Sequence, residues 1–111
     1  MVYDFRTGKL KLALQYLNHA LEIQSNEKEP SGLADIHLNI CAVLSQLDKH
    51  NEAMHASLNA IIILQDELIS ADLSSYENLS ERTSILAIAY HNLAVELEYL
   101  KRVNTDNSIL E

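Results

Sequence analysis

The sequence matches itself at two fixed displacements, and these matches constrain the fold more than any other feature. At a displacement of 53 residues, "LNICAVLSQLDK" at 38–49 aligns with "HNLAVELEYLKR" at 91–102. At a displacement of 40 residues, "GKLKLALQYLNHALEI" at 8–23 aligns with "DKHNEAMHASLNAIII" at 48–63. Similarity at a fixed displacement is typical of repeated units that bury their apolar faces against one another. We call the members of the first match first helices and those of the other match second helices.

The matched positions are mostly small or aliphatic, and their spacing is helical. In the first helices the matched pairs are Asn39/Asn92, Ile40/Leu93, Cys41/Ala94, Leu44/Leu97 and Leu47/Leu100. In the second helices they are Lys9/Lys49, Ala13/Ala53, Ala20/Ala60, Leu21/Ile61 and Ile23/Ile63. Apolar residues at i, i+4 and i+7 form one stripe on a helix. Small residues in that stripe let two helix backbones approach closely, so the pattern predicts packed helix pairs.

The composition favours one all-α domain. Only 2 Gly, 1 Pro, 5 Tyr and 1 Phe occur among 111 residues, whereas strands are enriched in β-branched and aromatic residues, and the length is typical of a single domain. Asn78 and Glu81 predict a capping box near the start of the last helix. The predicted organisation is a second helix at 8–25, a full repeat at 32–70, the first helix of the next repeat at 78–102 and a tail at 103–111.

The order of these residues resembles the tetratricopeptide repeat (TPR) family. The family's pattern is a Leu and a small residue, an apolar residue, a turn, an Ala, and a further Ala before an aliphatic residue, and 39–61 is similar to it with Ile40 in place of the Leu. Gly8 at the turn, followed by Ala13, Leu17, Ala20 and Leu21, is similar to the family's second helix. The displacement of 40 exceeds the family's usual length of about 34 and is similar to the extended repeats of kinesin light chains and LGN-type adaptors. The family's frequent Trp and terminal Pro are missing. The resemblance implies antiparallel helix pairs stacked as a short α-solenoid.

The resemblance also implies a peptide groove. First helices line the concave groove of TPR proteins, and an Asn before the Leu-small pair often faces into it, as Asn39 and Asn92 would here. An amide both donates to and accepts from an extended peptide backbone; the alternative is that these amides bond to a neighbouring helix or to water. Helical spacing adds six neighbours, which are Asp35, Ala42, Gln46, Ile88, Val95 and Tyr99. None of the eight is basic, so a carboxylate clamp is disfavoured and a neutral or basic peptide is expected.

Charge and residue types exclude several classes of function. A formal charge of −8 repels phosphate, so we expect no nucleic acid partner. The single Cys41 favours a reducing, intracellular setting, and no stretch approaches the roughly 20 apolar residues that cross a bilayer. The 5 His lack metal-ligand spacing, and 2 Gly cannot form a phosphate loop. We therefore expect no enzyme activity, no metal and no cofactor.

Both ends of the predicted stack are open, because 8–25 lacks its first helix and 78–102 lacks its second. A repeat buries its apolar face only against its neighbours. We therefore expect a structural component of a larger cytoplasmic assembly, completed by other chains or by further repeats. The alternatives are a peptide-binding adaptor and a compact four-helix bundle. The stretch 89–100 is also similar to repeats in large cytoskeletal and ciliary TPR proteins, which implies such a location.

Overall fold

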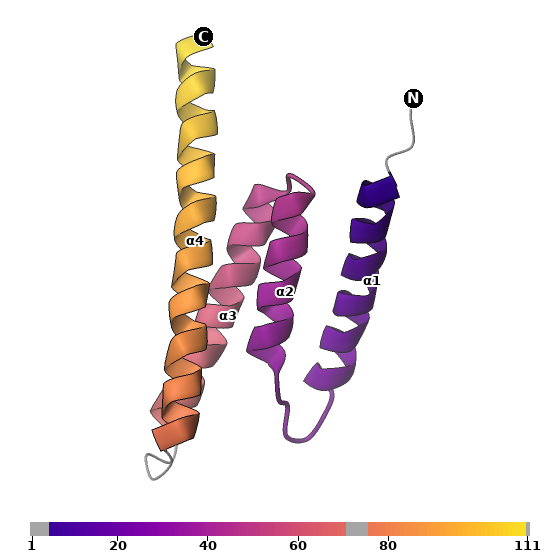
Figure 1. Cartoon of the computed structure of the whole chain (residues 1–111), viewed down its shortest axis with the longest axis vertical. Coiled ribbons are helices and arrows are strands. Elements are labelled where there is room, and N and C mark those ends of the chain that lie inside the picture. Colours follow the sequence, from indigo (N-terminus) through magenta and orange to yellow (C-terminus); the bar gives the residue numbers. More distant parts are fainter. Residues whose placement is uncertain (1–4, 71–75, 111) are drawn as a thin grey trace.

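The computed structural model describes the backbone of residues 5–70 and 76–110, and the side chains of 5–70 and 77–105. This part of the chain forms four helices, α1 (Phe5–Ser25), α2 (Leu33–Gln46), α3 (His50–Ser70) and α4 (Tyr76–Leu110). It contains no strand, so the all-α prediction is confirmed. Successive helices run in opposite directions (Figure 1).

Each helix packs against the next one in the chain. α2 packs against α1 and α3, and α4 packs mainly against α3 with a smaller contact to α2. Within the described residues, α1 and α4 do not pack against each other, and they lie on opposite sides of the α2–α3 pair (Figure 1). The molecule is elongated, with principal extents of 54 × 31 × 20 Å.

Two apolar clusters hold the helices together. The first joins α1, α2 and α3 through buried Ile40, Cys41, Leu44, Ala53 and Ala56, with Leu14, Leu17, Leu21 and Ile36 packed against them. The second joins α2, α3 and α4 through buried Ala34, Ala60, Ile61, Leu64 and Ala89, with Leu38, Ile63, Ile85, Leu86 and Leu93 packed against them. The small residues of both clusters stand where helices meet, so a larger side chain there would force the helices apart.

A tight turn at 47–49 joins α2 to α3. The amide of Asp48 donates to the carbonyl of Ser45 (3.1 Å), and that of Lys49 donates to the carbonyl of Leu44 (2.9 Å). These two bonds form a Schellman motif, which satisfies carbonyls at the end of a helix. Asp48 has a φ of 61°, in the left-handed region that Gly adopts most readily. Gly32, with a φ of 67°, supplies the same conformation directly before α2.

The two outer helices are longer than predicted. α1 begins at Phe5, so Gly8 lies inside a helix and not at a turn. α4 begins at Tyr76, before the predicted cap at Asn78, and stays helical through 103–110, where we predicted a tail. Neither Gly nor Pro occurs in 76–110, so no residue type there breaks the helix. Residues 71–75, between the predicted repeat at 32–70 and the predicted helix at 78–102, lie outside the described residues.

Candidate functional site

The eight groove residues predicted from the sequence form one strip on α2 and one on α4. The residues of α2 are exposed, and these are Asp35, Asn39, Ala42 and Gln46. On α4, Asn92 is half-buried, while Ile88, Val95 and Tyr99 are exposed. Spacings of three, four and seven residues keep each set on one side of its helix.

The structure brings four of these eight residues together in a pocket of about 280 Å³ between α2 and α4. Ala42 and Gln46 line the pocket from α2, and Asn92 and Val95 line it from α4. The other four predicted residues do not line it. Of these, Tyr99 lines a neighbouring pocket of about 230 Å³ on α4, together with Val95.

Four further residues line the α2–α4 pocket that the sequence analysis did not select, namely Cys41, Ser45, His91 and Glu96. Of these, Glu96 could have been selected from its position in the sequence. It stands seven residues after Ala89 and four before Leu100, so it falls within the apolar stripe of its helix. A carboxylate at such a position is rarely buried unless it has a partner.

The partner of Glu96 is His50, the first residue of α3. Glu96 is 2% exposed, and its Oε2 lies 2.6 Å from Nδ1 of His50. The His50 ring stacks on Tyr99, with ring centroids 3.6 Å apart and an interplanar angle of 28°. Its Nε2 lies 3.6 Å from Oδ1 of Asp48, which is exposed. This cluster attaches α4 to the start of α3 and fixes the Tyr99 ring.

The thiol of Cys41 is buried and packs in the core. Burial, with a smaller contribution from the charge of Glu96, raises the pKa of Cys41 from 9.0 to about 11. The thiolate is the reactive form, and it is disfavoured here because it would be buried beside a carboxylate. Thiol catalysis is therefore a poor match to this site.

Arg6 of α1 adds a cation next to the pocket. Its Nη2 donates to Oε1 of Gln46 at 3.4 Å, and Nε2 of Gln46 donates to the carbonyl of Ala42 at 3.4 Å. None of the residues selected from the sequence is basic, so this cation is a feature that helical spacing alone did not show. It arises because the start of α1 lies beside the end of α2.

The side-chain amides of Asn39 and Asn92 form no hydrogen bond with another described residue. The proposal that they bond to a neighbouring helix therefore finds no support in the described part of the chain. Asn92 lines the pocket, whereas Asn39 lies on the exposed surface beyond it. Each amide keeps a donor and an acceptor available to water or to a ligand.

Two exposed apolar surfaces lie outside this groove. The first, which we call the α1 stripe, consists of Phe5, Leu12, Tyr16 and Ile23, each between 48% and 68% exposed. The second, the α4 outer face, consists of the apolar Tyr90, Ala94 and Leu97 with the charged Lys101 at its end, which follow one another at intervals of four, three and four residues and are all exposed.

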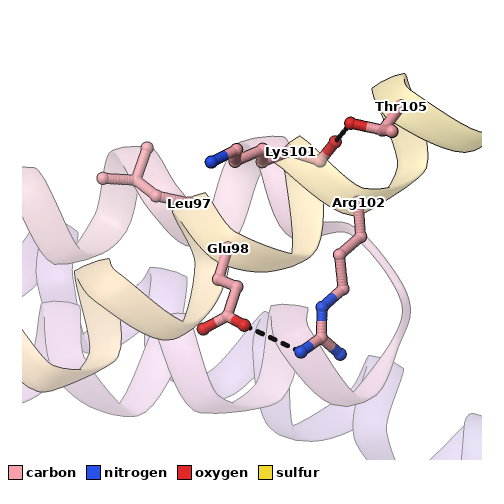
Figure 2. A pocket seen from close by; sticks show the side chains of 5 residues that line it. All are labelled: Leu97, Glu98, Lys101, Arg102 and Thr105. Carbon is pink, nitrogen blue, oxygen red and sulfur yellow. Dashed lines mark hydrogen bonds and ion pairs between the residues drawn. The ribbon is translucent and has the colours of Figure 1, made fainter. Parts of the chain in front are cut away.

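The α4 outer face continues past Leu97 into an open pocket. Figure 2 shows this pocket, of about 540 Å³, which is lined by Leu97, Glu98, Lys101, Arg102 and Thr105. Nη2 of Arg102 donates to Oε1 of Glu98 at 2.7 Å, so this ion pair forms one border of the pocket. Both partners are more than half exposed, and such pairs contribute little stability.

No group of three His, Cys, Asp or Glu side chains in the described residues is arranged to hold a metal ion. None of the helices, over the same residues, has the length and apolar character needed to cross a membrane. Comparison with known proteins gave no match to a family, to a curated protein or to a solved structure.

Proposed function

We propose that the chain is a non-enzymatic protein-interaction scaffold, a TPR-like helical-repeat segment that serves as a structural component of a larger assembly. Its end surfaces, the α1 stripe and the α4 outer face, would be covered by other protein chains or by further repeats. The proposal includes a cytoplasmic location, with a cytoskeletal or ciliary assembly as the narrower expectation, and it requires no cofactor.

One observation carries this proposal. Cys41 and Leu44 of α2 are 2% and 6% exposed, and the repeat matches them to Ala94 and Leu97 of α4. Ala94 is exposed and Leu97 is 48% exposed. The same sequence pattern is thus covered in α2 and uncovered in α4, which supports a protein partner for the uncovered copy, since exposed apolar surfaces mark interaction sites.

Crosslinking in the native cell tests the proposal. We expect a photoreactive phenylalanine analogue in place of Leu97 to crosslink to protein, whereas the same analogue in place of the exposed Asp66 of α3 crosslinks far less. Equal, background labelling from both positions would show that the α4 outer face has no protein partner. The proposal would then be wrong.

A second candidate function is peptide binding in the α2–α4 pocket. It is favoured by the pocket of about 280 Å³ and by the available amide of Asn92, and it calls for a neutral or basic peptide with small apolar side chains. The double variant Asn39→Ala, Asn92→Ala should weaken peptide binding at unchanged helicity, and Asn59→Ala, on the exposed surface of α3, is the matched control. If the double variant recovers the same peptides as the wild type from a displayed library, the groove has no such role.

A further inference from the structure

The α2–α3 contact shows what kind of helix fits on the α4 outer face. α3 runs antiparallel to α2 and covers it with small residues, because Ala53 and Ala56 pack in the same cluster as Cys41 and Leu44. The repeat matches α4 to α2 position by position, so the α4 outer face has the pattern that α3 covers in α2. A helix with the pattern of α3 is therefore its natural occupant.

α1 is such a helix, and the surface it would use is exposed. The repeat matches Ala13 of α1 to Ala53 of α3, and at the same displacement Tyr16 falls on Ala56. Ala56 is 5% exposed, whereas Tyr16 is 68% exposed. α1 thus resembles α3 in sequence, but it leaves exposed at Tyr16 a position that α3 buries at Ala56. Leu12 of the α1 stripe falls on Glu52, which is exposed in α3 as well.

The two surfaces cannot meet within one molecule. α1 and α4 lie on opposite sides of the α2–α3 pair (Figure 1) and do not pack against each other in the described residues. The α1 stripe and the α4 outer face are therefore two separate surfaces of one molecule.

We propose that the α1 stripe of one molecule packs antiparallel on the α4 outer face of a second copy of this chain, as α3 packs on α2. This inference rests on the proposed function, because it names the partner of the same end surfaces. The contact joins two different surfaces, so it is heterologous and extends into an open row of molecules unless it closes into a ring. Tyr16 would lie against Ala94 and Leu97, where the small Ala94 leaves room for the aromatic ring.

Apolar burial, and not charge, would hold this contact together. In the antiparallel arrangement the start of α1, with Arg6, Lys9 and Lys11, approaches the part of α4 that carries Lys101 and Arg102. These are like charges, although Glu98 offsets one of them. We therefore expect added salt to strengthen the association, because salt screens repulsion between exposed charges.

Light scattering on the purified chain tests the inference. A single helix-on-helix contact is small, so we expect a weak equilibrium with a dissociation constant on the order of 100 µM. The mass-average molar mass should rise above the monomer value of 12.5 kDa as the concentration increases. Tyr16→Arg and Leu97→Arg should each weaken self-association at least tenfold, because an arginine cannot be buried unpaired in an apolar contact.

Mixing the two variants gives the sharpest result. Tyr16→Arg retains an intact α4 outer face and Leu97→Arg retains an intact α1 stripe, so an equimolar mixture should form a dimer of one molecule of each and stop there. Ile62→Arg, at a 63% exposed position of α3, is the matched control and should associate like the wild type. Both tested positions are exposed, and circular dichroism verifies that each variant keeps its helicity.

Two outcomes would overturn the inference. A wild-type chain that stays monomeric up to about 1 mM, roughly ten times the expected dissociation constant, has no such contact. A mixture of the two variants that stays monomeric while the wild type associates shows that the copies meet through other surfaces. Crosslinking from position 97 separates this failure from failure of the proposed function. A product with a different protein refutes the second copy and retains the scaffold, whereas absence of any product refutes both.

Discussion

Replacing His50 with Ala should destabilise the fold strongly, because Glu96 would keep its burial and lose its partner. The two side chains are 11% and 3% exposed and are joined at 2.6 Å. A hydrogen bond to a charged group contributes about 1.5 to 3 kcal/mol, and an unpaired buried charge costs about 3 to 5 kcal/mol. The ring contact with Tyr99 adds about 0.5 to 1.5 kcal/mol. We expect a loss of about 3 to 4 kcal/mol, a large part of the 5 to 15 kcal/mol typical of a domain.

Thermal unfolding followed by circular dichroism measures this loss. For a chain of this length the expected decrease in Tm is on the order of 12 °C. His55→Ala, at an exposed position of the same helix, is the control and should change stability by about 0.5 kcal/mol or less. A double-mutant cycle with Glu96→Gln separates the pair from its surroundings, with an expected coupling energy above about 1 kcal/mol. A His50→Ala chain that melts within about 3 °C of the wild type would refute the assigned role of this pair.

Three further predictions follow from the backbone and from the pKa values of the described groups. Iodoacetamide should label Cys41 at pH 8 at least about a hundredfold more slowly in the folded chain than in urea, since a pKa of about 11 in place of 9.0 lowers the thiolate fraction by that factor. Mass spectrometry measures the labelling rate, and equal rates in the two states would contradict the burial of the thiol. Asp48→Gly should raise the free energy of unfolding by about 0.5 to 1 kcal/mol and Gly32→Ala should lower it by about 1 kcal/mol, because the backbone is left-handed at both positions. Urea titrations measure both changes, and an opposite sign for either variant is evidence against the backbone conformation described at that position. Burial lowers the pKa of His37 below its usual 6.5, so the unfolded chain binds more protons than the folded chain near and below that pH. The free energy of unfolding should therefore fall as the pH drops from about 7 to 5. The variant His37→Gln should show a shallower pH dependence of stability, and an identical slope would exclude His37 as the source of that dependence.

The periodicity of the sequence was sufficient to predict the helices but not their full lengths. Stripes at i, i+4 and i+7 indicate where a helix buries its face, and those of α2 and α3 correspond to the buried Ile40, Leu44, Ala53 and Ala60. The length of α4 was missed because family resemblance, and not a breaking residue, set the predicted end at Arg102. The residues at 103–108 are Val, Asn, Thr, Asp, Asn and Ser, which are weak helix formers, so local preference did not predict the continuation to Leu110 either.

The composition of the α2–α4 pocket could be predicted only in part, because it depends on how two helices are aligned along their axes. The repeat matches Asn92 to Asn39, but in the structure Asn92 shares its pocket with Ala42 and Gln46. The matched pair Ala42 and Val95 lines this pocket, whereas of the matched pair Asn39 and Asn92 only Asn92 does, so the repeat alone does not say which matched positions the pocket includes. The pairing of Glu96 with His50 likewise depends on the rotation of α4 over the start of α3, which no local pattern encodes.

The two apolar clusters have no residue in common, and this separation limits how the molecule responds to force or to damage. The α1 contact depends on the cluster around Cys41, and the α4 contact depends on the cluster around Leu64. When the side chains of one cluster lose their packing, the other cluster therefore stays packed. Hydrogen exchange should show two opening events with separate free energies. Within the described residues, α1 and α4 are connected only through the α2–α3 hairpin, so a force applied to α1 reaches α4 through that hairpin. The α2–α3 hairpin thus contributes to both clusters, and the α1 contact and the α4 contact can open independently of each other.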